Sequence, residues 1–478
     1  MQPVISRALS LSALLLLNGC SLLPMVGPDY QLPSFSLPAL WSTPVASAAL
    51  PASELACWWR QLNDPLLDRL IDEALTGSVD LKLAQSRLQQ ARASREQAVS
   101  GLFPTLTASA GASRTKNATV ISALPARTLY DAGFDASWEI DLFGGTRRGI
   151  EAASAELAAS QASLNNARVS LLAEVAQNYV ELRAYQHRLA IARDNLASQS
   201  ETVQITEWRN QAGLASSSDV EQARTSREQT RASIPDLEIG QAAAENRLAV
   251  LLGKNPGALH DELAEMQDFP PVPASVGAGI PADVLRQRPD LIVAERTLAA
   301  ETARLGQKQA QRFPSLNLGG SFGWQAYSFG ALGGSDTLMR AISGTLAATL
   351  FDGGKLRSAV NIQSAVQEQA LLSYQNGVLG ALEEVENALT AYAASRERLE
   401  ARQAAAEAAR NAAALTRNLY QSGLADFQKV LETERTRLSA EDSLATAQAS
   451  RLTCLITLYK ALGGGWQAAA PSTENGKS

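Results

Sequence analysis

Residues 132–140 read AGFDASWEI, and their alternation of apolar and polar side chains decides the fold class. Successive side chains of a strand point to opposite faces of a sheet. One face would carry Phe134 and Trp138, and the other would carry Asp135 and Glu139. About ten residues of this kind are typical of a transmembrane barrel strand, apolar outside and polar inside. By itself the stretch also fits a half-buried strand of a soluble sandwich.

Three further segments alternate in the same way, so we expect four strands, at about 105–113, 130–141, 315–326 and 341–351. Four strands are too few to close a membrane barrel, for which eight is about the lower limit. An open sheet edge in lipid leaves backbone groups without partners, so three chains should share one twelve-stranded barrel. The residues expected to face lipid are Phe134, Trp138, Leu316, Leu318, Phe322, Trp324 and Leu346.

The chain also contains an internal repeat, which predicts two copies of one structural unit. We place the first copy at 58–253 and the second at 281–466, with a Pro-rich linker at 254–280 and a tail at 467–478. Three pairs of matching positions share an offset of 210 residues: Phe103 and Phe313, Gly213 and Gly423, and Gly253 and Gly463.

Each copy is expected to contain a first helix, two strands, a very long helix and a return helix. The first helices are predicted at 64–101 and 281–312, because the Phe-Pro pairs that follow stop a helix. The long helices are predicted at 146–212 and 354–422, and the return helices at 216–252 and 426–462. At 1.5 Å per residue each long helix would measure roughly 100 Å. Such helices fit a tunnel wall or a plain coiled-coil stalk, and the need to close the barrel favours the tunnel.

The N-terminus has the features of a bacterial lipoprotein signal. Residues 1–19 contain Arg7 and an apolar run, 8–17, that is too short to span a bilayer. They end at Leu-Asn-Gly before Cys20, which resembles a lipobox, so we expect a diacylglycerol and an N-acyl (palmitate) group on Cys20. A conventional signal peptide with a chance cysteine is the alternative. Residues 20–57 are then expected to form a lipidated, extended tether.

Composition argues against several other classes of function. The net charge of -6 and the two histidines of this 478-residue chain make nucleic-acid binding, a metal site, a cofactor or an enzyme activity improbable. Residues 142–146 and 350–354 are Gly-rich, but they lack the Gly-Lys-Ser/Thr ending of a phosphate loop and fit strand-to-helix turns. Cys57 and Cys454 could pair in an oxidising compartment, although unpaired thiols are favoured.

Four segments carry a resemblance to a known family: 26–30, 58–65, 280–291 and 458–466. The chain resembles the TolC-type outer-membrane factors, most closely the lipoprotein branch that works with resistance–nodulation–division pumps. This resemblance implies an α+β membrane protein in a Gram-negative outer membrane: a homotrimeric, twelve-stranded barrel continuous with a long helical barrel in the periplasm.

The resemblance also implies a role. The channel would be the exit of a tripartite efflux pump, exporting drugs or other small toxic molecules passively. Its partners would be a periplasmic adaptor, an inner-membrane transporter of the same pump class and outer-membrane lipid. The alternatives are the channel of a type I protein secretion system and a coiled-coil structural lipoprotein without a pore.

Finally, the resemblance assigns roles to residues near the far turns of the long helices. A periplasmic constriction is implied at Tyr420, Gln428 and Glu432, where family members commonly have an aspartate in place of Glu432. An ordinary solvated charge is the alternative for Glu432. Contact with the adaptor or pump is implied for the turns, namely Gly213, Leu214, Ala215, Gly423, Leu424 and Ala425.

Overall fold

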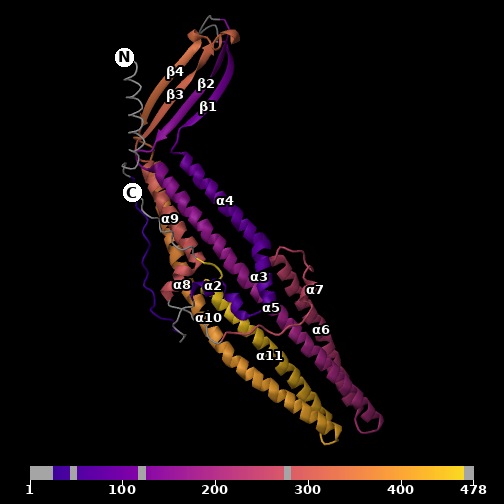
Figure 1. The fold of residues 1–478 in the computed structure, drawn as a ribbon. Coiled ribbons are helices and arrows are strands. Elements are labelled where there is room, and N and C mark those ends of the chain that lie inside the picture. Colours follow the sequence, from indigo (N-terminus) through magenta and orange to yellow (C-terminus); the bar gives the residue numbers. More distant parts are fainter. Residues whose placement is uncertain (1–24, 43–50, 117–124, 274–280, 468–478) are drawn as a thin grey trace. The chain divides into compact units, whose positions relative to one another are not determined.

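The computed structural model describes residues 25–42, 51–116, 125–273 and 281–467, which divide into two compact units. Figure 1 gives the order of the elements along the chain. The helices are α2 (Ala52–Ala56), α3 (Pro65–Gly77), α4 (Val79–Ser100), α5 (Gly145–Gln211), α6 (Ser217–Leu251), α7 (His260–Leu263), α8 (Pro281–Gln287), α9 (Pro289–Ala310), α10 (Lys355–Gln421) and α11 (Phe427–Ala461). The strands are β1 (Thr105–Thr115), β2 (Arg127–Ile140), β3 (Ser315–Ala326) and β4 (Leu338–Ala347), and short 3-10 turns lie at Trp58–Leu62, Phe329–Ala331 and Ser335–Thr337.

The first unit comprises residues 1–34, 87–161 and 292–376 and contains one antiparallel sheet. The strands follow one another in the order β1-β2-β3-β4, so each pairs with its neighbour in the sequence of strands (Figure 1). Strands β1 and β2 come from the first repeat, and β3 and β4 come from the second. The central pair β2–β3 therefore joins the two copies of the repeat.

The long helices reflect the repeat closely. Helices α5 and α10 have 67 residues each, and α6 and α11 have 35 residues each. Their ends lie within one residue of the predicted bounds, which is the ordinary scatter of helix ends. Helix α6 continues through Pro235, which the prediction did not consider. None of the described helices is both long and apolar enough to cross a membrane.

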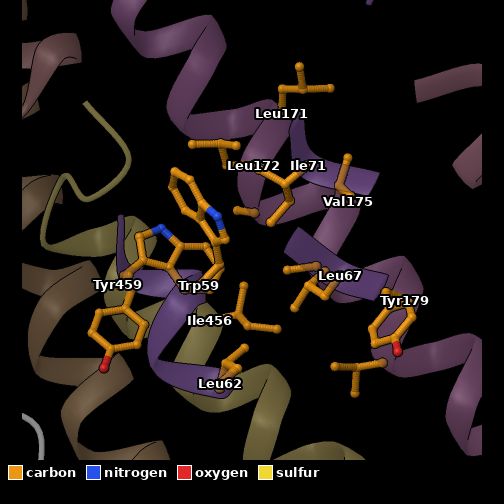
Figure 2. Close-up of a cluster of buried hydrophobic side chains, with 14 of the residues drawn as sticks. Trp59, Leu62, Leu67, Ile71, Leu171, Leu172, Val175, Tyr179, Ile456 and Tyr459 are labelled. Carbon is orange, nitrogen blue, oxygen red and sulfur yellow. The ribbon is translucent and has the colours of Figure 1, made fainter. Parts of the chain in front are cut away.

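The second unit comprises residues 35–86, 162–291 and 377–478, and it holds the main hydrophobic core. Figure 2 shows the centre of this core, where Trp59 and Leu62 meet Ile71 from α3, Leu172 from α5 and Ile456 from α11. These side chains are at most 2 % exposed. The buried ring of Trp58 stacks on Tyr459 with centroids 5.2 Å apart. The core thus packs helices of both repeats around one aromatic centre.

The predicted first helix of each repeat is wrong in one respect, because each is broken in two. In the second repeat the break lies at Arg288, since a residue that precedes a proline avoids the helical conformation. In the first repeat it lies at Ser78, where the chain approaches the end of α6. A Cβ on Gly77 would lie 2.2 Å from the carbonyl oxygen of Leu252, so this contact requires glycine.

Two strand predictions also need correction. Strand β4 covers 338–347 rather than 341–351, because its pairing with β3 runs from Trp324↔Leu338 to Ser315↔Ala347. Beyond Ala347 no residue of β3 remains to pair, since Pro314 precedes that strand. Strands β1 and β2 extend further toward their connection than predicted, through the pair Thr115↔Arg127.

Candidate functional site: the membrane face of the sheet and the helical tips

All seven residues predicted to face lipid lie on one face of the sheet. The register fixes this arrangement, because directly paired residues point to the same side. The pairs are Phe134↔Phe322, Trp138↔Leu318, Ala132↔Trp324 and Leu316↔Leu346.

This face is open and apolar. Phe134 and Phe322 are 47% and 46% exposed, and Ile342 of β4 is 95% exposed. A contiguous apolar face of this kind marks an interaction surface, and on a strand of membrane-spanning length it fits lipid.

The opposite face is polar. Strand β2 contributes Asp131, Asp135 and Glu139 at every fourth position. Their partners on the neighbouring strands are uncharged: Gly111, Thr107, Gln325, Ser321 and Asn317. The sheet therefore separates an apolar surface from an acidic one, as the alternation in the sequence predicts.

Among the described residues β1 pairs only with β2, and β4 pairs only with β3, so each outer strand has one edge without a partner strand. In hydrocarbon each unsatisfied backbone group costs several kcal/mol, so a membrane sheet must pair its edges. Strand β1 runs antiparallel to β2, and each following strand reverses again. An edge β4 can therefore continue antiparallel into the β1 of another copy.

The strand-to-helix turns lie where the Gly-rich segments were assigned. Residues 141–144 join β2 to α5, and residues 348–354 join β4 to α10. Gly144 has a φ of 82°, a conformation that favours glycine. In the second turn Asp352 accepts hydrogen bonds from the backbone amides of Gly354 and Leu356, which lowers the pKa of its carboxyl. Both segments thus act as caps that start long helices.

At the other ends of α5 and α10 the two tips are built alike. Gly213 and Gly423 have φ values of 73° and 75°, and a Cβ on either would meet no atom within 4 Å. Each glycine follows the last helical turn in a Schellman-type arrangement, with Leu214 N bonded to Arg209 O and Leu424 N to Leu419 O. Leu214 and Leu424 are 69% and 76% exposed, so each tip presents a leucine.

Beyond the turns, a cap starts each return helix. Ser216 and Asp219 form a capping box at the start of α6. Asp426 accepts the amide of Lys429 at the start of α11. The carbonyl of Ala215 accepts a bond from the side-chain amide of Asn210. Ala425 packs against a small hydrophobic core near the tips, which consists of Val203, Ala223, Tyr420, Phe427, Val430 and Leu431. The predicted contact residues therefore sit on hydrogen-bonded, capped turns.

The three predicted constriction residues occupy two different environments. Gln428 and Glu432 lie one turn apart on the exposed side of α11, and Glu432 pairs with Lys429 at 2.8 Å. Gln428 contacts Gln222 of α6. Tyr420 is only 4% exposed, and its ring packs on Phe427 in a small core. Tyr420 thus differs from the other two, because its side chain supports the tip from within.

Polar contacts connect α5 with α10 and α11 near this small core. Arg209 of α5 lies over the Tyr420 ring and donates to the Tyr420 carbonyl at 2.7 Å. Further along, Thr202 donates to the buried carboxylate of Glu434 at 3.0 Å. Burial raises the pKa of Glu434, and the nearby Arg417 and Arg437 oppose that rise. The sequence analysis did not single out Glu434, because nothing in the neighbouring sequence indicates that this charged residue of α11 is buried.

Sequence reasoning also missed an ordered contact of the N-terminal segment. Residues 25–30 were expected to belong to a plain tether, yet they are held by Arg148, which is 2% exposed. The segment from Val26 to Tyr30 had been singled out only by its resemblance to a family. Arg148 is more than a hundred residues from Gly27-Pro28-Asp29 in the sequence. Neither position belongs to a periodic pattern that would predict the contact.

The remaining predictions concern the cysteines and metals. Cys57 and Cys454 are both free, so no disulfide joins them. Cys20 lies outside the described residues. Within the described part of the chain, no cluster of three or more His, Cys, Asp or Glu side chains could hold a metal ion.

Comparisons with known proteins agree with this architecture. The outer membrane efflux protein family matches residues 70–254 and again 280–464, an offset of 210 at both ends. The chain is 33% identical to the pyoverdine export outer membrane protein OpmQ of Pseudomonas aeruginosa, over 96% of this chain and 98% of that protein. It is 32% identical to nodulation protein T of Rhizobium leguminosarum bv. trifolii, over 95% and 97%.

Among solved structures, the outer-membrane channel OprN superimposes with a TM-score of 0.86 at 36% identity, covering 93% of this chain and all of OprN. The open-state MtrE outer membrane channel of Neisseria gonorrhoeae gives 0.80 at 28% identity, over 93% and 99%. The predicted fold class, a four-stranded share of a trimeric barrel with long helices, is therefore confirmed, and so is the location in the outer membrane. Because the family model matches both copies of the repeat, the chain belongs to the outer membrane efflux protein family.

Proposed function

We propose that three copies of this chain form the exit channel of a tripartite pump that exports drugs or other small toxic molecules. The observation that carries this proposal is the sheet, with one apolar face, one acidic face and two unpaired edges. Three copies of four strands give twelve, an even number that closes an antiparallel barrel and leaves an open lumen. Cargo crosses that lumen passively, and an energy-coupled transporter of the inner membrane drives the export.

The partners belong to the same proposal. A periplasmic adaptor and a resistance–nodulation–division transporter would meet the tips, where Leu214 and Leu424 are exposed on capped turns. Relatives named for export and efflux support this role. Acylation of Cys20 would anchor each N-terminus in the same membrane as the barrel. One acyl chain binds a membrane only marginally, but two or more acyl chains anchor a protein firmly.

The gate is proposed at Gln428 and Glu432. Both are exposed near one tip, on the face of α11 that is not packed on the Tyr420 core. In a trimer three Glu432 carboxylates would converge on the axis, where they attract cations and repel one another. Tyr420 contributes indirectly by supporting this end of α11.

Deletion of the gene and a panel of toxic compounds test the export role. We expect the deletion strain to become more sensitive to several small toxic compounds and to regain resistance with the wild-type gene. Normal resistance together with loss of one secreted protein would instead identify a type I secretion channel. Unchanged resistance and unchanged secretion would contradict both transport roles.

Photo-crosslinking tests the partner contact. A photoreactive amino acid at Leu214 or Leu424 should capture a periplasmic adaptor in intact cells. Ile239 of α6 is a matched control, because it is 68% exposed and far from either turn in the sequence. Equal capture at Ile239, or no capture at either leucine, would remove the contact role from the tips.

A further inference from the structure

Within the first unit, the N-terminal segment 25–30 packs against the β2–α5 turn and helix α9. The amide of Val26 donates to the carbonyl of Phe143 at 3.1 Å, in the turn between β2 and α5. Four residues later the hydroxyl of Tyr30 donates to Glu295 of α9 at 3.1 Å. Burial and the neighbouring Glu295 carboxylate raise the pKa of Tyr30. The segment is therefore attached at both ends.

Arg148 holds the middle of this segment. Its Nε donates to the carbonyl of Val26 at 3.2 Å, and one terminal nitrogen donates to Gly27 O at 3.1 Å and to Asp29 at 2.8 Å. The other terminal nitrogen donates to Glu151 at 2.7 Å. A guanidinium buried to this degree is stable only when it is paired and hydrogen-bonded. Three of its four bonds go to the N-terminal segment.

Glycines make this close approach sterically permissible. A Cβ on Gly27 would lie 2.4 Å from the Cα of Gly306 in α9, and Gly27 has a φ of 100°. A Cβ on Gly306 would lie 2.9 Å from Nε of Arg148 and 3.0 Å from the carbonyl oxygen of Val26. A Cβ on Gly144 would collide with Met25 at 2.9 Å. Glycine is therefore required at three positions where the segment contacts the rest of the unit, because a Cβ at any of them would collide with a neighbouring atom.

We propose that Arg148 is a positioning residue that clamps the N-terminal segment and so fixes the acyl anchor beside the β2–α5 turn. The proposal rests on the proposed acylation of Cys20. Cys20 and Met25 are five positions apart in the sequence, and a fully extended chain of that length spans at most about 18 Å. An acyl group on Cys20 would then enter the membrane near the end of β2, which would tie the depth of the sheet to the anchor.

Limited proteolysis of the purified, detergent-solubilised trimer tests the clamp. Residues 25–42 contain no Lys or Arg, but chymotrypsin can cut after Tyr30 and Phe35. In Arg148→Gln we expect the rate of cleavage after Tyr30 to rise about tenfold or more, because bonds to a charged group hold the segment closed and cleavage follows the open population. Mass spectrometry of the released N-terminal fragment measures this rate.

Two further variants keep this test decisive. Arg304→Gln is the matched control, since the Arg304 guanidinium of α9 pairs with Glu156 and Glu301 rather than with segment 25–30 and should leave the rate near that of the wild type. Gly27→Ala changes only the segment and should raise the rate even if Arg148→Gln fails to assemble. Wild-type rates in both Gly27→Ala and Arg148→Gln would overturn the clamp.

A double-mutant cycle tests the coupling to the lipid. Cys20→Ser behind a conventional cleavable leader removes the acyl groups. We expect it to lower the temperature of trimer dissociation in lipid vesicles by about 2–4 °C with Arg148 present, and by less than half as much in Arg148→Gln. Equal losses in both backgrounds would overturn the coupling. If mass spectrometry finds no acyl group on Cys20 in the wild type, the acylation proposal fails, and the proteolysis result still decides the clamp.

Discussion

Glu432 is the residue on which the proposed gate depends. It pairs with Lys429 on the same helix and is still 66% exposed on α11, so its carboxylate can face an axis shared by three copies. Removing the charge in Glu432→Ala should raise the single-channel conductance in a planar bilayer and weaken block by divalent cations, because mutual repulsion and cation binding both disappear.

The first repeat provides a matched control for this change. Glu221 of α6 lies at a similar distance from its own turn and also has a basic partner three residues away on its helix, Arg224, at 2.9 Å. Glu221→Ala should leave the conductance unchanged. If both variants behave like the wild type, Glu432 is an ordinary solvated charge and the gate lies elsewhere.

Glu434, two residues further on, should make the tip sensitive to pH. Its pKa is raised by burial, so the folded protein holds the proton to a higher pH than the unfolded chain does. Stability at the tip is therefore greatest below the ordinary glutamate pKa and falls as the pH rises through the raised pKa. The protection factors of α11 amides, which remove the base catalysis of exchange itself, should fall over that interval.

Replacing this carboxylate isolates its effect. Glu434→Gln keeps an oxygen that can accept from Thr202 but carries no charge. We expect this variant to slow exchange at pH 7, consistent with a desolvation penalty of about 1–3 kcal/mol, and to flatten the pH dependence. A variant that exchanges faster than the wild type at pH 7 would mean that the attraction of Arg417 and Arg437 outweighs burial.

At the scale of residues, the sequence indicates which residues belong to the proposed constriction better than it indicates whether each one is buried or exposed. The family motif places Tyr420 with Gln428 and Glu432, but only packing reveals that Tyr420 turns inward onto Phe427. Tyr420 ends α10 and Gln428 and Glu432 lie on α11, and apolar and polar residues alternate closely along both helices. Burial is then decided by a neighbouring helix that is remote in the sequence.

At the scale of elements, the β2–β3 pair depends on two facing glycines. A Cβ on Gly323 would lie 2.6 Å from the carbonyl oxygen of Ala132 and 2.7 Å from the Cα of Gly133. Gly323→Ala should therefore force the strands apart and cost about 1–3 kcal/mol. The temperature at which the trimer dissociates on a gel measures this loss.

The same strand offers a control. A Cβ on Gly320 would meet only the carbonyl oxygen of Ala341, at 3.9 Å, which is ordinary contact. Gly320→Ala should leave the dissociation temperature near that of the wild type. An equal loss in both variants would point to a general penalty of alanine on the sheet rather than to the close β2–β3 approach.

The alternation and the repeat predict most of the elements, because both are local patterns in the sequence. The fixed offset locates the long helices, and α5 and α10 have equal lengths. Strand ends are less predictable, since β4 stops at Ala347 only because β3 starts at Ser315. The docking of residues 25–30 is a contact over more than a hundred residues, which no local pattern specifies.

At the scale of the whole molecule, closure of the barrel turns a row of carboxylates into a selectivity element. Asp131, Asp135 and Glu139 share one face, and the residues that the described register pairs with them on β1 and β3 are uncharged. With three copies around a lumen, their fields add within low-dielectric walls, which concentrates cations. The channel should therefore prefer cations over anions, most strongly at low salt, where the Debye length exceeds about 10 Å.

Neutralising this row tests both the closure and the direction of the faces. The triple variant Asp131→Asn, Asp135→Asn, Glu139→Gln keeps the size of each side chain, and the ratio of cation to anion permeability should fall roughly tenfold. Reversal potentials in asymmetric KCl measure that ratio. Arg340→Gln is the control, because Arg340 pairs with Phe322 on the apolar face and should leave the ratio unchanged. A response to Arg340→Gln with none to the triple variant would mean that the apolar face lines the lumen, and a barrel in lipid would then be excluded.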